Sequence, residues 1–222
     1  MIFGAVAESS KSRATKLTKG SKFRRAQEAC KRDSSIHHHE LFAHEDSRPA
    51  PPKRMKPLPY SAHEGRVNPK GIPCLYMATD NNTAMTEVCP QAASILTVAK
   101  MVLTCDVIVV DCTCDSSFEL KDETPERLER NAWYCINEAF PLPSLKEDAL
   151  ADYAPTQYPA GVFRESGFGG IMYRSAVGSG NNVALFDLKA ARVSGRQLHD
   201  GKKISIEFKR LRWIPVRRRN PR

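Results

Sequence analysis

The chain has 222 residues, of which 41% are hydrophobic, and a formal net charge of +9. This composition is that of a globular protein with one large domain or two small ones. It excludes a membrane-spanning protein, because no apolar run approaches membrane-spanning length, and runs such as residues 107–110 are only long enough for a strand. The apolar start at residues 1–7 is too short for a signal peptide and follows no basic segment, so a cytoplasmic protein is expected.

The positive charge lies in the two flanks of the chain. Residues 1–60, 61–188 and 189–222 carry net charges of +7, −8 and +10, which together give the +9 of the whole chain. The tail, with arginines at 217–219 and Trp213 nearby, has the side chains that nucleic-acid binding requires. No nucleic-acid module pattern accompanies it, so the sequence favours a solvated tail or a surface for an acidic protein partner.

Cysteines and histidines predict no metal site. The seven cysteines are odd in number and form no CxxC pair, which indicates free reduced thiols, although Cys112 and Cys114 share one face of a predicted strand. Histidines cluster at 37–39 and 44. The spacing of five between His39 and His44 differs from the four that places two zinc ligands on one helix face.

The first third of the chain shows few regular patterns. Residues 1–22 are rich in Lys, Ser and Thr and are predicted to be a flexible basic N-terminal segment. Residues 23–31 are predicted to form a short helix. Five prolines within residues 45–59 indicate extended or looped chain. Residues 23–222 are predicted to form a single domain, with a motif core at 57–188 and a basic C-terminal strand and tail at 189–222.

The motif core begins with a predicted strand at 72–78, entered through a turn of glycine and proline. Thr83 is predicted as the N-cap of a helix through Glu87 and Val88, which Pro90 closes. Strands are expected at 95–103 and 107–112.

A clearer helix follows Thr124, with Pro125 at its first position. Its spacing places one apolar face at Leu128, Ala132, Cys135, Ile136 and Ala139.

The rest of the chain continues the mixture of helices and strands. Residues 152–165 have a helical composition that Pro159 and Gly161 weaken. Residues 171–177 and 183–188 are predicted to form a hairpin, and residues 204–213 a last strand. Because the alternation is irregular, the sequence predicts a mixed α/β or α+β sheet fold.

The segment of residues 65–87 suggests a site for a charged nucleotide. Arg66 lies in a Gly-Arg-x-Asn-Pro turn, and its guanidinium suits a diphosphate or a carboxylate. Tyr76 ends an apolar strand, where it either belongs to the core or stacks on a ligand ring. Glu87 lies on the short helix, either as an ordinary exposed carboxylate or facing a cleft, where it stabilises positive charge or orients a nucleophile.

The predicted hairpin brings Ser175 close to Asn181 and Asn182, which places several hydrogen-bonding groups together. The Gly178-Ser179-Gly180 loop lacks the third glycine of a dinucleotide fingerprint and joins two strands, so it is interpreted as a hairpin turn.

Three sequence blocks together resemble the RES domain, the toxin half of bacterial RES–Xre toxin–antitoxin pairs. They are Phe-Arg-Arg-Ala-Gln at 23–27, the segment 65–76 with Thr83, Ala84 and Glu87, and a block running from 153–157 through Tyr-Arg-Ser at 173–175 to 180–186. The resemblance covers roughly residues 23–188 in the family's order, and the middle block is its most specific part.

The resemblance implies an α+β, ADP-ribosyltransferase-like fold of mixed, mostly antiparallel sheets with flanking helices. It implies NAD as substrate, with no further cofactor, and cleavage of the nicotinamide–ribose bond by hydrolysis or phosphorolysis. Transfer of ADP-ribose to a protein is the alternative activity. A catalytically weak binding module that uses the basic flanks is the non-enzymatic alternative. The implied partners are an Xre-type antitoxin and, by self-association, a second copy of the chain.

The resemblance also implies the roles of single residues. By position the family's arginine, tyrosine, glutamate and serine correspond to Arg66, Tyr76, Glu87 and Ser175. Arg25, with Arg24 as the second choice, and Arg66 would neutralise the diphosphate. Tyr76 would stack on nicotinamide or hold the ribose, and Glu87 would stabilise the developing cation. Ser175 would bond the nicotinamide half, and the family's asparagine corresponds to Asn182 or, as second choice, Asn181.

The sequence departs from the family pattern at three positions. Cys89 stands where arginine is expected after the glutamate, Gly161 where a helical Ala-Glu is expected, and Gly169 where Gly-Phe-Asp-Gly is usual. The last two departures remove acidic side chains near the strand of Ser175. They concern local packing or a surface facing the antitoxin, and they leave room for a weakened enzyme.

Overall fold

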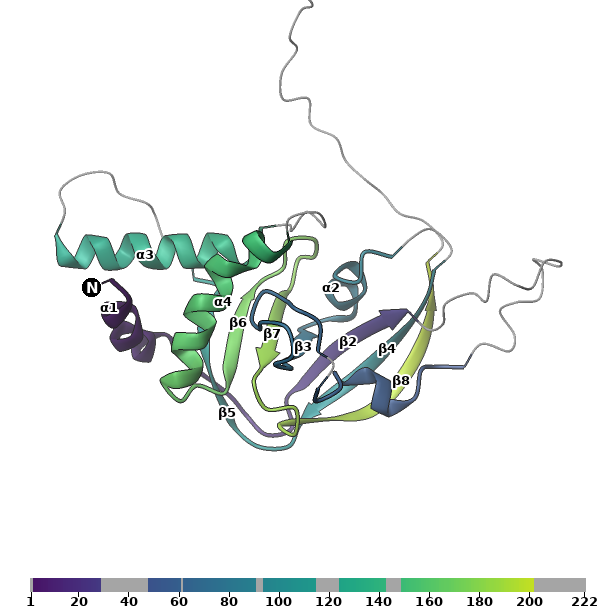
Figure 1. Ribbon diagram of the computed structural model, residues 1–222. Coiled ribbons are helices and arrows are strands. Elements are labelled where there is room, and N and C mark those ends of the chain that lie inside the picture. Colours follow the sequence, from purple (N-terminus) through teal and green to yellow (C-terminus); the bar gives the residue numbers. More distant parts are fainter. Residues whose placement is uncertain are drawn as a thin grey trace, which may run out of the picture.

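The computed structural model in Figure 1 describes residues 2–28, 48–60, 62–90, 94–114, 124–142 and 149–201. Its eight strands form one sheet in the order β1-β5-β6-β7-β3-β2-β4-β8. All neighbouring strands are antiparallel except β5 and β6, which are parallel. The predicted α+β class with a mostly antiparallel sheet is therefore confirmed. The strands are β1 Ala14–Leu17, β2 Lys22–Glu28, β3 Leu75–Ala78, β4 Ile95–Leu103, β5 Val107–Cys112, β6 Gly170–Arg174, β7 Asn181–Leu185 and β8 Ala191–Asp200.

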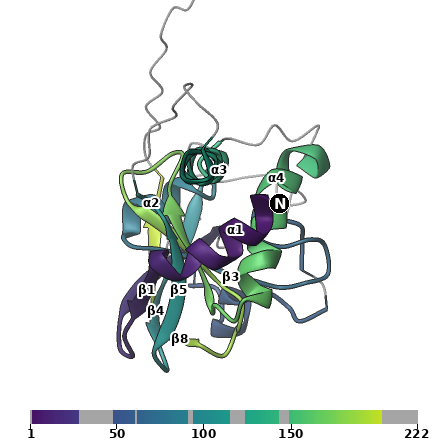
Figure 2. The same ribbon diagram turned by 90° about the vertical axis from the view of Figure 1, so that its left-hand side faces the viewer.

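Helices pack on one face of this sheet. Figure 2 shows α1 beside α3 and α4 at the β5 end, where Trp133, Phe140 and Phe163 are buried against Ile171 and Tyr173. The short α2 covers a smaller apolar cluster further along the same face. The helices are α1 Ile2–Ser9, α2 Asn81–Thr86, α3 Pro125–Ala139 and α4 Ala149–Glu165, with 3₁₀ turns η1 Ser10–Arg13 and η2 Pro52–Met55.

The other face of the sheet carries the largest core. Met55, from η2, is fully buried there against side chains of β3, β4 and β7, among them Leu75, Met101 and Leu185. The proline-rich segment predicted as looped chain thus contains a 3₁₀ turn that closes this core.

The N-terminal prediction was wrong. Residues 2–17 form α1, η1 and β1, and β1 pairs with β5 along its whole length. The described part of the helix predicted at 23–31 belongs instead to β2, because seven consecutive residues, Lys22–Glu28, pair with β4, whereas residues 29–31 lie outside the described residues. Long-range pairing of this kind overrides local propensity.

The other elements agree with the sequence to different degrees. β4 and β5 have the predicted bounds, and Thr124 and Pro125 begin α3 as expected. The predicted apolar face of α3 is only partly right, because Leu128 and Cys135 are exposed whereas Trp133 and Asn137 are buried. α4 continues through Pro155 and Pro159.

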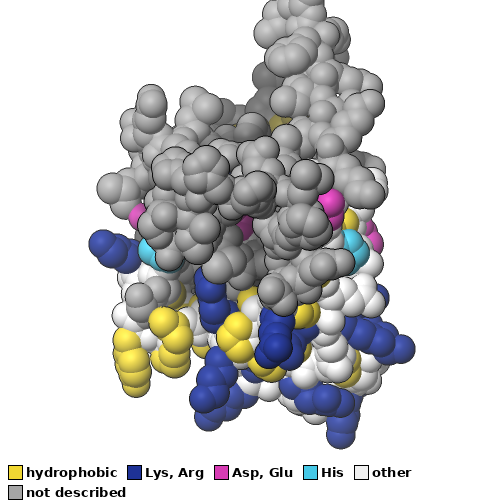
Figure 3. Space-filling view, turned by 90° about the vertical axis from the view of Figure 1, so that its right-hand side faces the viewer, with side chains coloured by type: hydrophobic (Ala, Val, Ile, Leu, Met, Phe, Trp, Pro, Cys, Tyr) yellow, Lys and Arg dark blue, Asp and Glu magenta, His cyan; other side chains and the backbone are white. Residues whose placement is uncertain are grey.

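The basic C-terminal flank begins with β8, an edge strand of the described sheet, whose Arg192 and Arg196 are exposed. Figure 3 shows Lys and Arg side chains gathered on this side of the molecule. The predicted strand at 204–213, the arginines at 217–219 and the histidines at 37–39 and 44 lie outside the described residues.

Candidate active site

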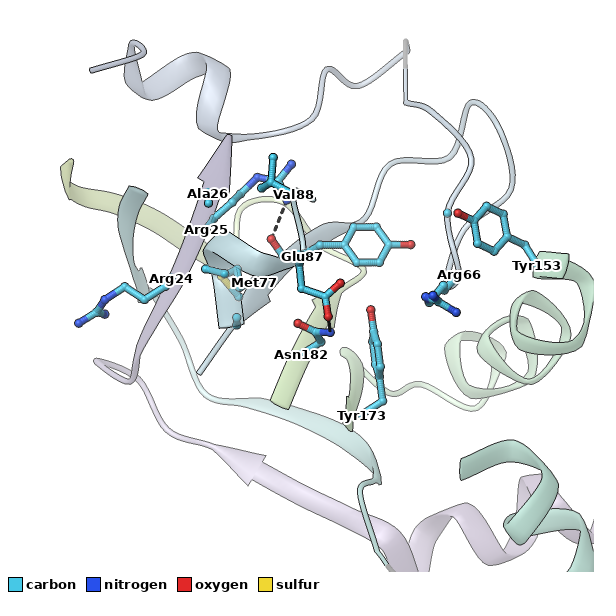
Figure 4. Close-up of a pocket in the computed structure, with 14 residues that line it drawn as sticks. Arg24, Arg25, Ala26, Arg66, Met77, Glu87, Val88, Tyr153, Tyr173 and Asn182 are labelled. Atoms are coloured by element: carbon cyan, nitrogen blue, oxygen red, sulfur yellow. Dashed lines mark hydrogen bonds between the residues drawn. The ribbon is translucent and has the colours of Figure 1, made fainter. Parts of the chain in front are cut away.

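A cavity of about 250 Å³ opens on the helix-bearing face, where β2 and β3 separate. These two strands are paired only at Arg24 and Ala78. Beyond that pair the strands diverge, and the Arg25 Nη1 donates a hydrogen bond of 2.6 Å to the carbonyl oxygen of Tyr76 across the gap. The lining residues are Arg24, Arg25, Ala26, Gly65, Arg66, Tyr76, Met77, Ala78, Ala84, Glu87, Val88, Tyr153, Tyr173 and Asn182 (Figure 4).

The short helix α2 places Glu87 at the cavity wall. Its N-cap is Asp80, not Thr83 as predicted. The Asp80 Oδ1 accepts from the backbone N–H of Thr83 at 2.8 Å, and its Oδ2 accepts from the Thr83 hydroxyl at 2.7 Å. These hydrogen bonds hold the pKa of the Asp80 carboxyl below its usual value. The helix ends at Thr86, and Glu87 is its C-cap.

The loop between β6 and β7 docks against α2. The Thr83 Oγ1 accepts from the backbone N–H of Gly180 at 3.0 Å. A Cβ atom at Gly178 or Gly180 would collide with Thr83. Glycine is therefore required here for close approach to the helix, so this loop is more than the hairpin turn inferred from the sequence.

The carboxylate of Glu87 is fixed by two donors. Its Oε1 accepts from the Ser175 hydroxyl and from the Asn182 Nδ2, both at 2.6 Å. The Ser175 oxygen itself accepts from the backbone N–H groups of Gly178, at 2.8 Å, and Val177, at 3.2 Å. Within the described residues no hydrogen bond reaches the other carboxylate oxygen, Oε2. That oxygen remains available to a ligand.

Arg66 projects from a closed turn. Gly65 and Asn68 exchange backbone hydrogen bonds of 3.0 and 3.2 Å. The Tyr76 hydroxyl donates to the Asn68 Oδ1 at 2.6 Å and accepts from the Val67 N–H at 2.9 Å, so the turn is tied to β3. The Arg66 guanidinium has no hydrogen bond or ion pair within the part of the chain that the structure describes.

Gln157 of α4 holds the same turn from outside. Its Nε2 lies at 2.9 Å from the Glu64 Oε1, at 3.0 Å from the Gly65 carbonyl oxygen and at 3.1 Å from the Asn68 carbonyl oxygen. Sequence reasoning did not single out Gln157, although it lies within the third block of the resemblance.

The resemblance left a choice between Arg25 and Arg24 as the arginine that would act beside Arg66. The structure distinguishes the two by where their side chains lie. Arg25 reaches into the gap between β2 and β3, and burial lowers the pKa of its guanidinium. Its Nε is buried and has no partner among the described residues. The Arg24 side chain points away from the cavity, and its Nε donates to the Asn81 Oδ1 at 2.7 Å (Figure 4). Arg25 is therefore better placed to meet a ligand.

The structure brings most of the predicted site residues together. Arg25, Arg66, Tyr76, Glu87 and Asn182 all line the cavity. Ser175 is outside the lining and bonds Glu87 instead, so it acts on the cavity through that carboxylate. The Asn181 backbone bonds Thr79, and the Asn181 side chain is not part of the lining.

Tyr153 and Tyr173 line the cavity without having been predicted as site residues. The signal for Tyr173 was the hairpin register, in which Tyr173 lies directly opposite Asn182 and therefore on the same face.

The described residues hold no cluster of three or more His, Cys, Asp or Glu side chains arranged to bind a metal ion. In the same residues, every helix is too short or too polar to cross a bilayer. Of the departures from the family pattern, Cys89 is exposed with a φ of 49°, in the left-handed region. A Cβ at Gly161 would meet open space, whereas one at Gly169 would collide with Val107.

Three comparisons with known proteins bear on the family of this chain. A chain in the crystal structure of the M. tuberculosis MbcT–MbcA toxin–antitoxin complex is similar, with a TM-score of 0.47 and 16% identity, over 90% of this chain and 93% of that one. A search of curated proteins gave no match. The RES domain family matches residues 37–206, which is more than half of the chain. The chain therefore belongs to the RES domain family.

Proposed function

We propose that the protein cleaves the nicotinamide–ribose bond of NAD. The observation that carries this proposal is the Glu87 carboxylate, which Ser175 and Asn182 hold by one oxygen at the wall of a cavity that two guanidinium groups also line. An anionic group beside cationic ones suits a substrate that carries a diphosphate and develops positive charge on a sugar. Membership of the RES family supports the same choice.

The charged side chains that line the cavity suit two parts of NAD, the diphosphate and the ribose that carries nicotinamide. The volume of about 250 Å³ lies below the range of about 300–1,000 Å³ that drug-sized ligands occupy, so the cavity accommodates part of a dinucleotide, with the remainder at its mouth. Arg25 and Arg66 supply guanidinium groups for the diphosphate, because their donors match phosphate oxygens. The Tyr76 ring forms an apolar wall while its hydroxyl holds the Arg66 turn.

Glu87 is suited to the transition state of this reaction. The nicotinamide nitrogen leaves with the bonding electron pair as a neutral pyridine, and the ribose C1′ becomes electron-poor. A fixed carboxylate beside C1′ stabilises that positive charge more than it stabilises the ground state. Water then attacks C1′ and releases a proton, giving ADP-ribose. With inorganic phosphate as the nucleophile the product is ADP-ribose 1″-phosphate.

The test is to incubate the purified protein with NAD and to measure nicotinamide by chromatography, with and without phosphate. Glu87→Gln keeps the volume of the side chain and removes its charge. We expect it to lower kcat by about 100- to 1,000-fold, the effect typical of losing one electrostatic group. Absence of nicotinamide release by the wild type under both conditions would overturn hydrolysis and phosphorolysis. Labelled NAD added to a lysate then decides on transfer to a protein.

We further propose that this activity makes the protein the toxin of a toxin–antitoxin pair whose antitoxin covers the cavity. Its support is the RES family membership together with a cavity open to solvent. Induced expression of the wild type should arrest bacterial growth and deplete cellular NAD, whereas Glu87→Gln should do neither. Growth arrest that persists in Glu87→Gln and Arg66→Ala, together with salt-dependent nucleic-acid binding, would favour the basic flanks as the active part instead.

A further inference from the structure

Tyr173 lies at the floor of the cavity in a way that core packing does not require. Its side chain is 4% exposed, and its ring stacks on Phe140 with a centroid distance of 5.1 Å and an interplanar angle of 27°. The hydroxyl end, however, points into the cavity toward Glu87 (Figure 4). Only the ring of Tyr173 packs in the core.

The hydroxyl of Tyr173 has no hydrogen-bond partner within the described residues. Because Tyr173 lines the cavity, this hydroxyl meets the space that a ligand would enter and can bond a ligand group there. Burial raises the pKa of Tyr173, and the neighbouring Glu87 raises it further while Arg66 lowers it. The phenol therefore stays protonated and can donate a hydrogen bond.

The neighbours of this hydroxyl define what it can recognise. Asn182, directly opposite Tyr173 on β7, uses its Nδ2 to hold the Glu87 Oε1. The free Oε2 of Glu87 is an acceptor, and the Tyr173 hydroxyl is a donor beside it. A neutral group that both accepts and donates, such as a sugar hydroxyl or a carboxamide, satisfies the two together, whereas a carboxylate would be repelled by Glu87.

We infer that Tyr173 is a substrate-binding residue, whose hydroxyl donates a hydrogen bond to a sugar hydroxyl or carboxamide of the nicotinamide–ribose half of the dinucleotide. This inference rests on the proposed function, of which it specifies one contact. It assigns to the floor of the cavity a role in selecting a neutral ligand group, in addition to the role of the ring in packing.

The test is Tyr173→Phe, which keeps the ring stacked on Phe140 and removes only the oxygen. We expect kcat/KM for NAD to fall on the order of tenfold, the effect of one lost hydrogen bond. The thermal midpoint should change little, because the hydroxyl is bonded to no described residue. Tyr60→Phe is the matched control, since the Tyr60 side chain is 96% exposed, and it should change neither quantity.

Calorimetric titration with the two products identifies the group that is contacted. Weaker binding of nicotinamide to Tyr173→Phe would assign the bond to the carboxamide, and weaker binding of ADP-ribose would assign it to the sugar. Unchanged kcat/KM and unchanged affinity for both products would overturn the inference. A lower thermal midpoint that accompanies the loss would also overturn it, in favour of a structural hydroxyl. A wild type that neither turns over NAD nor binds either product would instead refute the proposed function, and the inference with it.

Discussion

The contact between Ser175 and Glu87 leads to a prediction that separates two roles for the serine. From the resemblance, Ser175 would bond the nicotinamide half of the substrate. In the structure its hydroxyl donates to the Glu87 Oε1 at 2.6 Å and is outside the cavity lining. Ser175→Ala should therefore leave substrate binding almost intact and disturb the carboxylate that we propose to act in the transition state.

The size of this effect follows from the type of hydrogen bond. A bond to a charged group contributes about 1.5–3 kcal/mol, and the exposure of Glu87 places this one near the lower end. About 1.5 kcal/mol corresponds to a roughly tenfold lower kcat, because 1.4 kcal/mol is a factor of ten. Asn182 still holds the same oxygen, which prevents a complete loss.

The assay is steady-state release of nicotinamide over a range of NAD concentrations. We expect kcat to fall about tenfold while KM changes less than about twofold, the pattern of an interaction made in the transition state. Ser175→Thr retains the hydroxyl and should recover most of the activity. Ser194→Ala, on the exposed strand β8, is the control. A raised KM with an unchanged kcat would refute the positioning role and restore direct contact with the substrate.

Three further predictions concern the elements that hold the site. Gly180→Ala should lower the free energy of unfolding by about 1–3 kcal/mol in chemical denaturation, because its Cβ would collide first with the Asp80 carboxylate and also with Thr83, whereas Gly195→Ala, which meets open space, should not. The lowered pKa of Asp80 means that its carboxylate stabilises the fold above the ordinary pKa of about 3.9, and this contribution is lost as the pH falls through the lower folded value. Asp80→Asn keeps a good N-cap, so its unfolding free energy should vary less with pH below about 4, and an unchanged pH profile would contradict this. Gln157→Leu removes the donor that holds the Arg66 turn and should lower kcat/KM for NAD several-fold, and equal kinetics would show that the turn holds without it.

Local patterns were sufficient for the elements that are continuous and apolar. Residues 95–103 and 107–112 alternate little and are rich in apolar side chains, and both became strands with the predicted bounds. By contrast, β2 is basic and polar, and its strand conformation comes from pairing with β4, about 75 residues further along the chain. Nothing in the local sequence carries that information.

Most residues of the proposed site could be named from the sequence, whereas the contacts between them could not. The sequence resemblance identified Arg66, Glu87 and Ser175, yet 88 residues separate Ser175 from Glu87, and only the folded sheet shows that they bond each other. Likewise, the sequence left Tyr76 open between the core and a ligand ring, and only the structure shows that its hydroxyl also secures the Arg66 turn. Such contacts require side chains from different strands to lie within hydrogen-bond distance of each other. The spacing of residues along the chain does not determine that distance.

The central place of β7 makes assembly of the site a late event in folding. This strand is inserted between β3 and β6, and its Asn182 completes the clamp on Glu87. A chain that ends before residue 182 has Arg25, Arg66 and Glu87 but lacks the strand that places the carboxylate. Contacts of such long sequence separation form slowly, because loop-closure entropy opposes them. The partly synthesised chain should thus lack the proposed activity, which should appear only once β7 has paired with β3 and β6.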